Sequence, residues 1–233
     1  MNRIGLLRKI RDKNIRHMFA FLRAAITVKR VLRTIDQDDF SILRERYKDA
    51  DATPGGYSKY LDIRPWMIHK LTYFYLLGLR GSRPLRILDL GTGTGFFPYI
   101  CSLYGHRVIA LDLDTVPMYN DLCKFLGVDR RTWRIVKFEK LPDLDTRFDL
   151  VTAFMITFNQ HNRSDEWGAD EWRFMLEDLQ RNQLAPGGRI FLNLNLRSDG
   201  TWCDEALLRF FSDFGGRVYL NHVDLSASRG SLG

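Results

Sequence analysis

The sequence predicts an α/β fold with a doubly wound, mostly parallel sheet of six or seven strands, preceded by an N-terminal helical extension. The 233 residues are 45% hydrophobic and 27% charged, which is typical of a globular domain with a sizeable core. From Leu85 onward, short apolar runs alternate with helical segments, and a glycine-rich turn follows the first run. Repeated strand–helix units form parallel sheets with helices on their faces.

Each expected element follows from hydrophobic periodicity and from turn residues at its ends. We expect strands at residues 86–90, 107–111, 133–138, 148–154, 189–194 and 218–223. We expect helices at residues 3–35, 65–79, 116–126, 169–184 and 203–213. Two further helices are expected: one is capped by Asp38 or Asp39 and ends near Lys48, and the other runs from the glycine turn to about Tyr104. Residues 51–56 are expected to form a loop, and Pro186 with two following glycines should end a helix.

The charge distribution supports a division into a basic helical extension and lid at residues 1–80 and a second domain at residues 81–233. Residues 1–35 contain ten basic residues and one acidic residue, whereas the remainder has 25 basic and 27 acidic residues. The net charge of +7 therefore belongs to the extension, and it does not indicate that the main domain binds nucleic acid.

Composition excludes several classes of protein. No stretch approaches the roughly 20 apolar residues that a membrane span needs. The three cysteines, Cys101, Cys123 and Cys203, are too few and too widely spaced for a disulfide framework or a zinc site, so no metal is expected. Reduced and mostly buried thiols are typical of a cytoplasmic protein, which is the location we expect.

The most informative motif runs from Ile87 to Gly95, with glycines at positions 91, 93 and 95. A dinucleotide fingerprint would require a glycine at position 96, where this chain has phenylalanine. An acid, Asp89, stands two residues before the first glycine. This arrangement resembles motif I of class I (Rossmann-like) S-adenosylmethionine-dependent methyltransferases, and the resemblance extends over about residues 85–220.

The resemblance implies that S-adenosyl-L-methionine (SAM) is the cofactor. It assigns Asp89 to a contact with the ammonium group of the methionine part. It assigns Gly91 and Gly93 to backbone contacts with the ligand, and Gly95 completes the turn. Glycine suits these positions because it lets the backbone turn sharply and approach a ligand closely. The alternative is a tight strand-to-helix turn that binds nothing.

Asp112 ends the second expected strand, about 20 residues after the glycine turn. A carboxylate at this place can accept hydrogen bonds from both ribose hydroxyls. Asp114 is the alternative acid, although an N-cap of the helix at residues 116–126 suits it better.

The run Phe138-Glu-Lys-Leu-Pro142 resembles the family's adenine-binding motif. The resemblance assigns Glu139 to the amino group of the purine and Phe138 to its face. Lys137 departs from the pattern, because many relatives have an acid there. The alternative is a solvated Glu139 and a core Phe138.

Residues 155–161 follow the fourth expected strand, at the edge of the sheet where open α/β folds bind ligands, so they should flank the transferred methyl group. His161 is the candidate general base, since imidazole titrates near neutral pH, and a hydrogen-bonding loop histidine is the alternative. Asp149 is expected to be structural or on the rim.

The methyl acceptor is less well indicated. Polar and aromatic residues in segment 161–172, including Trp167 and Trp172, favour a small-molecule or sugar-type acceptor, although helix packing explains Trp172 equally well. Segment 55–60, with Arg64 and Trp66, could close the site, and Tyr57 and Tyr60 could contact the ligands or belong to the core. Two alternatives stay open: an RNA methyltransferase that uses the basic extension, and a SAM-binding protein without catalysis.

In the extension, Ile15, Met18, Phe19, Leu22 and Ile26 repeat with the period of one helix face. An apolar stripe among arginines and lysines is typical of a helix that lies on an anionic membrane. The alternative is a lid, in which this stripe packs on the catalytic domain.

Overall fold

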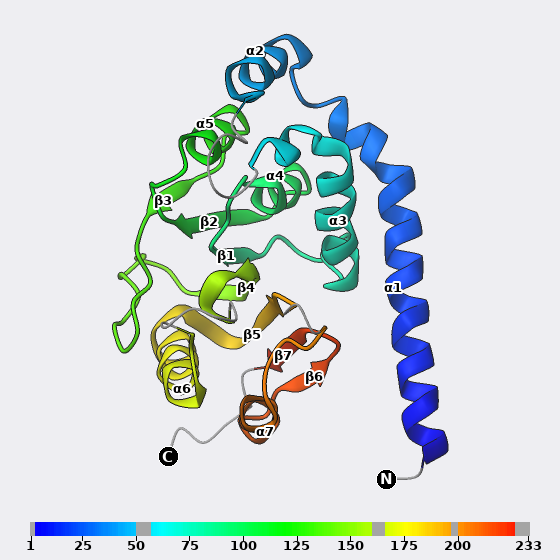
Figure 1. Ribbon diagram of the computed structural model, residues 1–233, viewed down its shortest axis with the longest axis vertical. Coiled ribbons are helices and arrows are strands. Elements are labelled where there is room, and N and C mark those ends of the chain that lie inside the picture. Colours follow the sequence, from blue (N-terminus) through cyan, green and yellow to red (C-terminus); the bar gives the residue numbers. More distant parts are fainter. Residues whose placement is uncertain (1–2, 50–56, 160–165, 197–199, 227–233) are drawn as a thin grey trace. The chain divides into compact units, whose positions relative to one another are not determined.

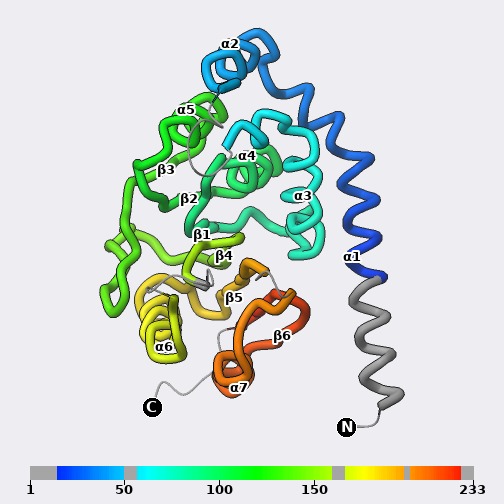
Figure 2. The backbone as a smooth tube through the Cα atoms, viewed as in Figure 1, coloured from blue at the N-terminus to red at the C-terminus, as the bar shows by residue number. Residues whose placement is uncertain are grey.

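The computed structural model describes residues 3–49, 57–159, 166–196 and 200–226, whose path Figure 2 traces. The expected loop at 51–56 lies outside these residues. The chain forms two compact units. We call them the helical unit (Met1–Pro84, Thr94–Gly105 and Val116–Val128) and the sheet unit (Leu85–Gly93, His106–Thr115 and Asp129–Gly233). The division at residue 80 stays a prediction.

The sheet unit contains one seven-stranded sheet with the order β3-β2-β1-β4-β5-β7-β6, in which β7 is antiparallel to β5 and β6 (Figure 1). Its strands are β1 (Arg86–Leu90), β2 (Arg107–Asp112), β3 (Arg130–Thr132), β4 (Phe148–Ile156), β5 (Leu184–Leu194), β6 (Arg217–Tyr219) and β7 (His222–Ser226). The strand order reverses direction between β1 and β4, where open α/β sheets bind their ligands. The predicted α/β class with a mostly parallel sheet is confirmed.

Helices α6 (Ala169–Asp178) and α7 (Glu205–Asp213) build the core of the sheet unit together with the strands. Trp172 and Leu176 of α6 and Phe211 of α7 are almost fully buried against strand residues such as Ile190. Strand β4 is buried along most of its length, which is typical of the central strands of a parallel sheet.

The third strand differs from the prediction. It covers Arg130–Thr132, not residues 133–138. A parallel strand needs a neighbour, and β2 ends at Asp112, whose carbonyl accepts the last ladder bond from the Trp133 amide at 2.9 Å. The β-forming residues after Trp133 therefore have no partner strand to extend along.

The run of proline and two glycines lies within β5, whereas we expected it to end a helix at residue 184. Helix α6 ends at Asp178, and a π-helical turn, η4 (Leu179–Gln183), leads directly into the strand. The register shifts between the pairs made by Phe148 and by Leu150, which marks a bulge. A Cβ at Gly188 would lie 2.9 Å from the Phe148 carbonyl oxygen, so the bulge needs a glycine there.

The single strand expected at 218–223 is a hairpin. Strands β6 and β7 are joined at Leu220, which has a positive φ of 48°. The hairpin completes the seven strands, and its two-residue turn, Leu220 and Asn221, lacks the glycine that commonly marks such a turn in a sequence.

The helical unit contains the elements α1 (Arg3–Leu32), α2 (Gln37–Tyr47), η2 (Tyr57–Leu61), α3 (Ile63–Leu76), α4 (Phe96–Leu103) and α5 (Pro117–Phe125). Helix α1 packs along α3, α3 packs on α4, and α2 packs on α5. None of the helices in the described residues has an apolar stretch sufficient to span a bilayer.

Several helix ends differ from the prediction. Asp36, not Asp38 or Asp39, is the N-cap of α2. Its carboxylate accepts hydrogen bonds from the backbone amides of Asp38 and Asp39, each at 3.0 Å. Val116 is the N-cap of α5, so the capping role expected for Asp114 is wrong. Helix α3 stops near Leu77, and Gly78 adopts the left-handed conformation that commonly follows a helix.

A charged cluster links α2 to α5. The carboxylate of Asp121 accepts hydrogen bonds from Tyr47 Oη and from Arg46 Nη1, each at 2.8 Å. The hydrogen bond from Tyr47, together with that from Arg46 and the guanidinium charge, lowers the pKa of Asp121 below its ordinary value. The carboxylate therefore contributes fully to stability when the pH is above the ordinary aspartate pKa. This contribution is lost as the pH falls through the lowered pKa of Asp121.

We expect Asp121→Asn to lower the free energy of unfolding by about 1 kcal/mol at neutral pH, since it removes one charged acceptor from two donors. The difference from the wild type should shrink in acid, where the wild-type carboxylate also becomes protonated. Urea denaturation at a series of pH values measures this. Asp213→Asn, at an exposed aspartate of α7, is the matched control, and an equal loss in both variants would contradict the prediction.

Candidate functional site

The glycine turn follows β1 directly. Gly91, Gly93 and Gly95 have φ values of 66°, 57° and 75°, a region that other L-residues rarely adopt. The Gly91 amide donates to the Leu111 carbonyl oxygen at 2.8 Å, and a Cβ at Gly91 would lie 3.2 Å from the side chain of Ile156. The turn thus requires glycine for both its conformation and its close packing. Gly95 is the N-cap of α4.

Asp112 lies at the carboxyl end of β2 and accepts backbone hydrogen bonds on both carboxylate oxygens. The amide of Gly93 donates to Oδ2 at 2.5 Å, and the amide of Leu113 donates to Oδ1 at 2.7 Å. Burial raises the pKa of Asp112, and the two amides oppose this shift without cancelling it. A carboxylate has about four acceptor positions, so roughly two are left for further donors.

Asp89, in the middle of the sheet, is 2% exposed. Its Oδ1 accepts a hydrogen bond of 2.6 Å from the hydroxyl of Thr152, its register partner on β4. Thr152 gave no signal in the sequence, because the pairing joins two strands that are 63 residues apart. The neighbouring strand β4 therefore fixes the position of this carboxylate.

Segment 133–142 is tied to α6 at several points. Lys137 Nζ donates to the carbonyl oxygen of Glu166 at 3.0 Å and lies 3.5 Å from the carboxylate of Glu171. The lysine that departs from the family pattern therefore fixes this segment to the start of α6. Phe138 has a positive φ of 60°, and its side chain is 54% exposed, with its ring in edge contact with Phe174. Glu139 is exposed.

Two residues that sequence reasoning missed hold the end of the same segment. The buried carboxylate of Asp178 accepts the amide proton of Leu141 at 3.0 Å, and Gln183 Nε2 donates to the carbonyl of Pro142 at 3.0 Å. The sequence carried no local signal for these contacts, because each joins residues that are about 40 positions apart. Asp149 proves structural, as expected, and accepts the Arg86 amide proton at 2.8 Å.

Strand β4 ends in an irregular segment. Met155 has a φ of 56° and is 45% exposed. The amide group of Asn195, which follows β5, donates to the carbonyl oxygens of Met155 and Ile156 at 3.0 and 2.9 Å. This fixes the backbone at the carboxyl ends of both strands. His161, the candidate base, lies outside the described residues.

The tryptophans after β4 are core residues. Trp167 stacks on Phe158 with a centroid distance of 3.9 Å, and Trp172 packs edge-on against Trp167 and Phe211. Both indoles are less than 10% exposed, so packing occupies the aromatic surface that we expected to favour a sugar-type acceptor.

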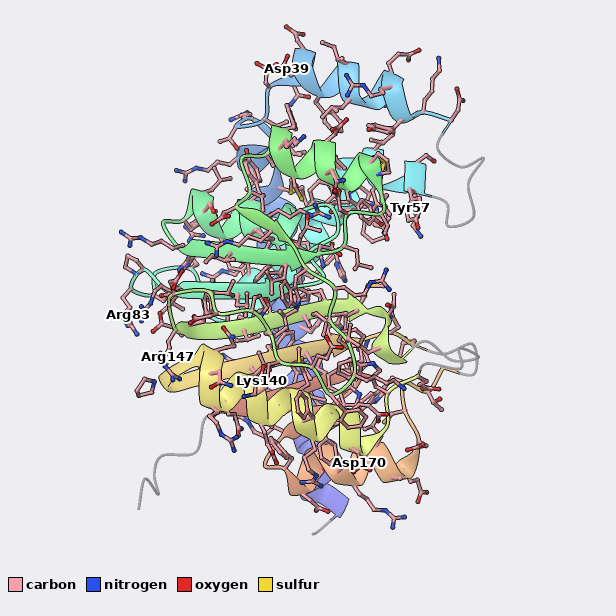
Figure 3. The ribbon with its side chains drawn as sticks, turned by 90° about the vertical axis from the view of Figure 1, so that its left-hand side faces the viewer. Asp39, Tyr57, Arg83, Lys140, Arg147 and Asp170 are labelled. Carbon is pink, nitrogen blue, oxygen red and sulfur yellow. The ribbon has the colours of Figure 1, made fainter. Side chains whose placement is uncertain are left out.

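In the helical unit, the rings of Tyr57 and Tyr60 both contact Tyr119 of α5, at centroid distances of 5.4 and 5.7 Å. Tyr60 also packs on Trp66, whose indole donates to the Lys59 carbonyl at 2.9 Å. These contacts give the half-buried tyrosines (Tyr57 is labelled in Figure 3) a structural role. Their role in closing a site stays a prediction.

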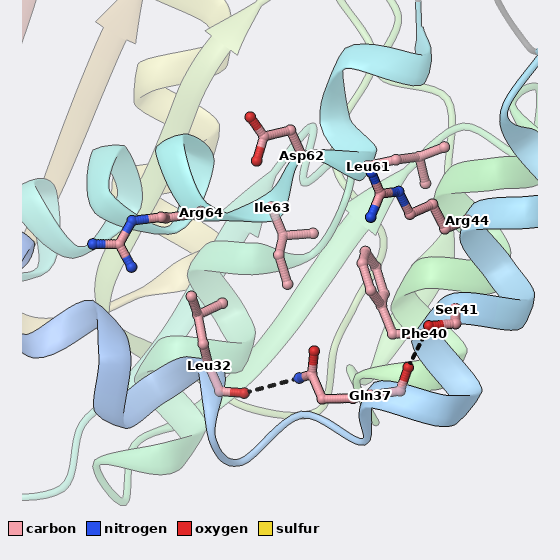
Figure 4. Close-up of a pocket in the computed structure, with 9 residues that line it drawn as sticks. All are labelled: Leu32, Gln37, Phe40, Ser41, Arg44, Leu61, Asp62, Ile63 and Arg64. Atoms are coloured by element: carbon pink, nitrogen blue, oxygen red, sulfur yellow. Dashed lines mark hydrogen bonds between the residues drawn. The ribbon is translucent and has the colours of Figure 1, made fainter.

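Two surface hollows contain none of the predicted cofactor-binding residues, although Arg64, one of the residues expected to close the site, lines the first. One of about 220 Å³ lies in the helical unit (Figure 4), where Gln37 donates to the Leu32 carbonyl at 3.2 Å. The other, of about 570 Å³, is in the sheet unit and is lined in part by Lys140 and Arg147, which Figure 3 labels. Among the described residues, no three His, Cys, Asp or Glu side chains form a group that could hold a metal ion.

Residues 88–192 match the family model of a methyltransferase domain, and this segment includes the glycine turn, Asp112 and segment 133–142. The match agrees with the resemblance to class I SAM-dependent methyltransferases that motif I carries, and this resemblance is confirmed.

Similar solved structures include three methyltransferases. A SAM-bound amino pentose methyltransferase from Micromonospora echinaspora is 23% identical, with a TM-score of 0.39, over 54% of this chain and 48% of its own. A SAM-dependent methyltransferase from Aquifex aeolicus is 18% identical, with a TM-score of 0.47, over 67% and 89%. The 1,6-didemethyltoxoflavin-N1-methyltransferase from Burkholderia thailandensis is 19% identical, with a TM-score of 0.48, over 82% and 89%.

The chain spans about half the length of the amino pentose methyltransferase, 48%, and of the glycopeptide N-methyltransferase MtfA, 53%. A search of curated proteins gave no match.

Substituting Gly91 tests whether the turn needs its close approach to Ile156. We expect Gly105→Ala, where a positive φ is the only obstacle and no atom lies within 4 Å of the added Cβ, to destabilise the protein by about 1 kcal/mol. Gly91→Ala should destabilise it more, because the methyl group also meets the isoleucine side chain. Equal losses in thermal or urea unfolding would show that conformation alone selects glycine at position 91.

Proposed function

We propose that the protein is a SAM-dependent methyltransferase that acts on a small-molecule or sugar-type acceptor. The observation that carries this proposal is the geometry at Asp112. Its carboxylate is fixed by the amides of Gly93 and Leu113 at the carboxyl end of β2, and roughly two acceptor positions remain for the two ribose hydroxyls of the cofactor.

The other proposed cofactor contacts follow the family motifs. Gly91 and Gly93 would lie against the methionine part of the cofactor, with Gly95 next in the turn, and the carboxylate of Asp89 would act on its ammonium directly or through water. The near-complete burial of Asp89 favours the water-mediated form or a purely positioning role.

Phe138 and Glu139 are the proposed adenine contacts. The left-handed backbone of Phe138 is unfavourable for a bulky residue, and such conformations persist where the surrounding structure enforces them, frequently at ligand sites. Its half-exposed ring offers an apolar surface for a purine, and Glu139 offers an exposed carboxylate to the amino group.

When bound, SAM supplies an electrophilic methyl group on a cationic sulfur. The protein's task is then to position the acceptor atom in line with the sulfur–methyl bond and to exclude water. Asp112 and the glycine turn would hold the cofactor, which would supply the methyl group and leave with the bonding electron pair on its sulfur. A protonated acceptor must also lose a proton, and we propose His161 as the group that takes it.

A small polar acceptor is favoured over RNA because the chain beyond residue 35 carries slightly more acidic than basic residues. The cytoplasmic location is also a proposal, and so is peripheral contact with an anionic membrane through residues 1–35, which does not depend on methyl transfer. A SAM-binding protein without catalysis shares the same cofactor site and is distinguished only by turnover.

Calorimetry with SAM tests the cofactor site directly. We expect the wild type to bind, and Asp112→Asn to bind about tenfold to a hundredfold more weakly, because it removes the charge from the hydrogen bonds to the ribose. Asp114→Asn, at the exposed acid two residues away, is the control and should bind as the wild type does. Absence of wild-type binding at millimolar SAM would refute the proposed function.

The raised pKa of Asp112 predicts a pH dependence of cofactor affinity. The ionised carboxylate accepts the ribose hydrogen bonds better, so affinity should fall as the pH drops through this raised pKa, at a higher pH than an ordinary aspartate would allow. In Asp112→Asn this fall should disappear. An unchanged pH profile in the variant would assign the titration to another group.

Turnover separates an enzyme from a binding protein. We expect S-adenosylhomocysteine to accumulate when the protein is incubated with SAM and a panel of polar small molecules and sugars. His161→Gln should lower kcat most for acceptors that are protonated at neutral pH, while leaving SAM affinity unchanged. Release of product with RNA alone would favour the alternative acceptor.

A further inference from the structure

Helix α1 presents two different faces, and the buried face consists of small or β-branched residues. Ala20, Ala24 and Val28 are at most 5% exposed, where α1 packs along α3. Thr27 and Tyr75 share a hydrogen bond of 2.7 Å, and the Arg23 guanidinium lies 5.4 Å from the centre of the same tyrosine ring. This face is therefore fully used inside the helical unit.

The large apolar residues of α1 lie on the opposite side of the helix. Phe19 is 57% exposed, Leu22 is 48% exposed and Ile26 is 80% exposed. We call the following set the outer stripe of α1: Ile15, Met18, Phe19, Leu22 and Ile26, which are spaced three, one, three and four residues apart. At 100° per residue these positions share one face, about half a turn from Ala24.

Basic side chains lie along one side of the outer stripe and beyond its C-terminal end, and one of them, Arg23, also contacts the Tyr75 ring. The exposed cations of this part of α1 and its end are Arg16, Arg23, Lys29, Arg30 and Arg33. No acidic residue occurs between Asp12 and Asp36. An exposed apolar stripe with cations and no acidic residue beside it is typical of a helix that lies in a membrane interface.

We infer that the outer stripe of α1 docks on the surface of a lipid bilayer that contains anionic headgroups. The aromatic and aliphatic side chains would enter the boundary between headgroups and acyl chains, and the cations would meet the phosphate and carboxylate groups around them. Helix α1 lies along the surface in this arrangement, in keeping with the lack of a spanning stretch among the described helices.

Charge complementarity favours lipid over a second copy of this chain. Two outer stripes face to face would bring together two sets of five cations with no acidic residues among them. A nucleic acid would satisfy the cations, but its phosphates offer nothing to the exposed Phe19 and Ile26. Anionic lipid satisfies both the charge and the apolar surface.

Vesicle co-sedimentation tests the inference on the full chain. We expect the wild type to sediment with vesicles that contain phosphatidylserine, and much less with pure phosphatidylcholine or at high salt. The double variant Phe19→Ser, Ile26→Ser should bind the anionic vesicles about tenfold more weakly or worse. Both residues are exposed, so the variant should keep its helical circular dichroism.

Ile42→Ser is the matched control, because Ile42 is 59% exposed on α2, outside the outer stripe. It should sediment with the vesicles as the wild type does. Calorimetric SAM affinity should be equal in all these proteins, which keeps the result independent of the proposed methyl transfer. Equal vesicle binding by the double variant and the wild type, or no binding by the wild type at low salt, would overturn the inference. A dimer that the double variant dissociates in sedimentation equilibrium would assign the stripe to a second copy instead.

Discussion

The hydrogen bond from the Gly93 amide to the carboxylate of Asp112 is the constraint on which the candidate site depends. It joins the glycine turn after β1 to the end of β2, across 19 residues of sequence. The two strands place their ends together because Leu90 pairs with Leu111 in the parallel ladder. The turn must then bring an N–H group to the carboxylate, which explains why left-handed glycines, free of Cβ atoms, occupy it. Burial makes the same carboxylate harder to ionise, so the backbone donors matter both for its position and for its charge.

Helix α6 stabilises segment 133–142, which contains the proposed adenine contacts. Lys137 reaches the start of the helix, Phe138 contacts its middle through Phe174, and the Leu141 amide donates to Asp178 at its end. These three ties are spread along the segment, and together they can hold Phe138 in an unfavourable left-handed conformation. Strain of this kind needs neighbours that leave no alternative. The lysine that departs from the family pattern is thus one of the residues that fix the segment's position.

Sequence alone predicted what depends on local patterns. The first strand, the glycine turn and Asp112 follow from a short motif and the length of one strand–helix–strand unit, and the structure places Gly93 and Asp112 in contact. The third strand was placed too late because its end depends on where β2 stops, which no pattern around Trp133 records. Thr152 and Asp178 were missed for the same reason, since each bonds to a residue that is distant in the sequence. Pro186 and the two glycines were predicted to end a helix, whereas they form a bulge within β5, because turn residues look alike inside and outside a strand.

The helical periodicity of α1 was visible in the sequence, but the face that packs was not. A stripe of large apolar residues ordinarily indicates the buried face, and by that rule Phe19, Leu22 and Ile26 would be buried, whereas they are exposed. The structure buries Ala20 and Ala24 instead, because short side chains let α1 approach α3 closely enough for Thr27 to reach the Tyr75 hydroxyl. Because α1 packs through its small residues, its bulky apolar residues stay on the surface, where their contact with water is unfavourable. The exposed stripe lies beside five cations and no acidic residue, so a surface that is both apolar and anionic would stabilise it. The interface of an anionic bilayer is such a surface.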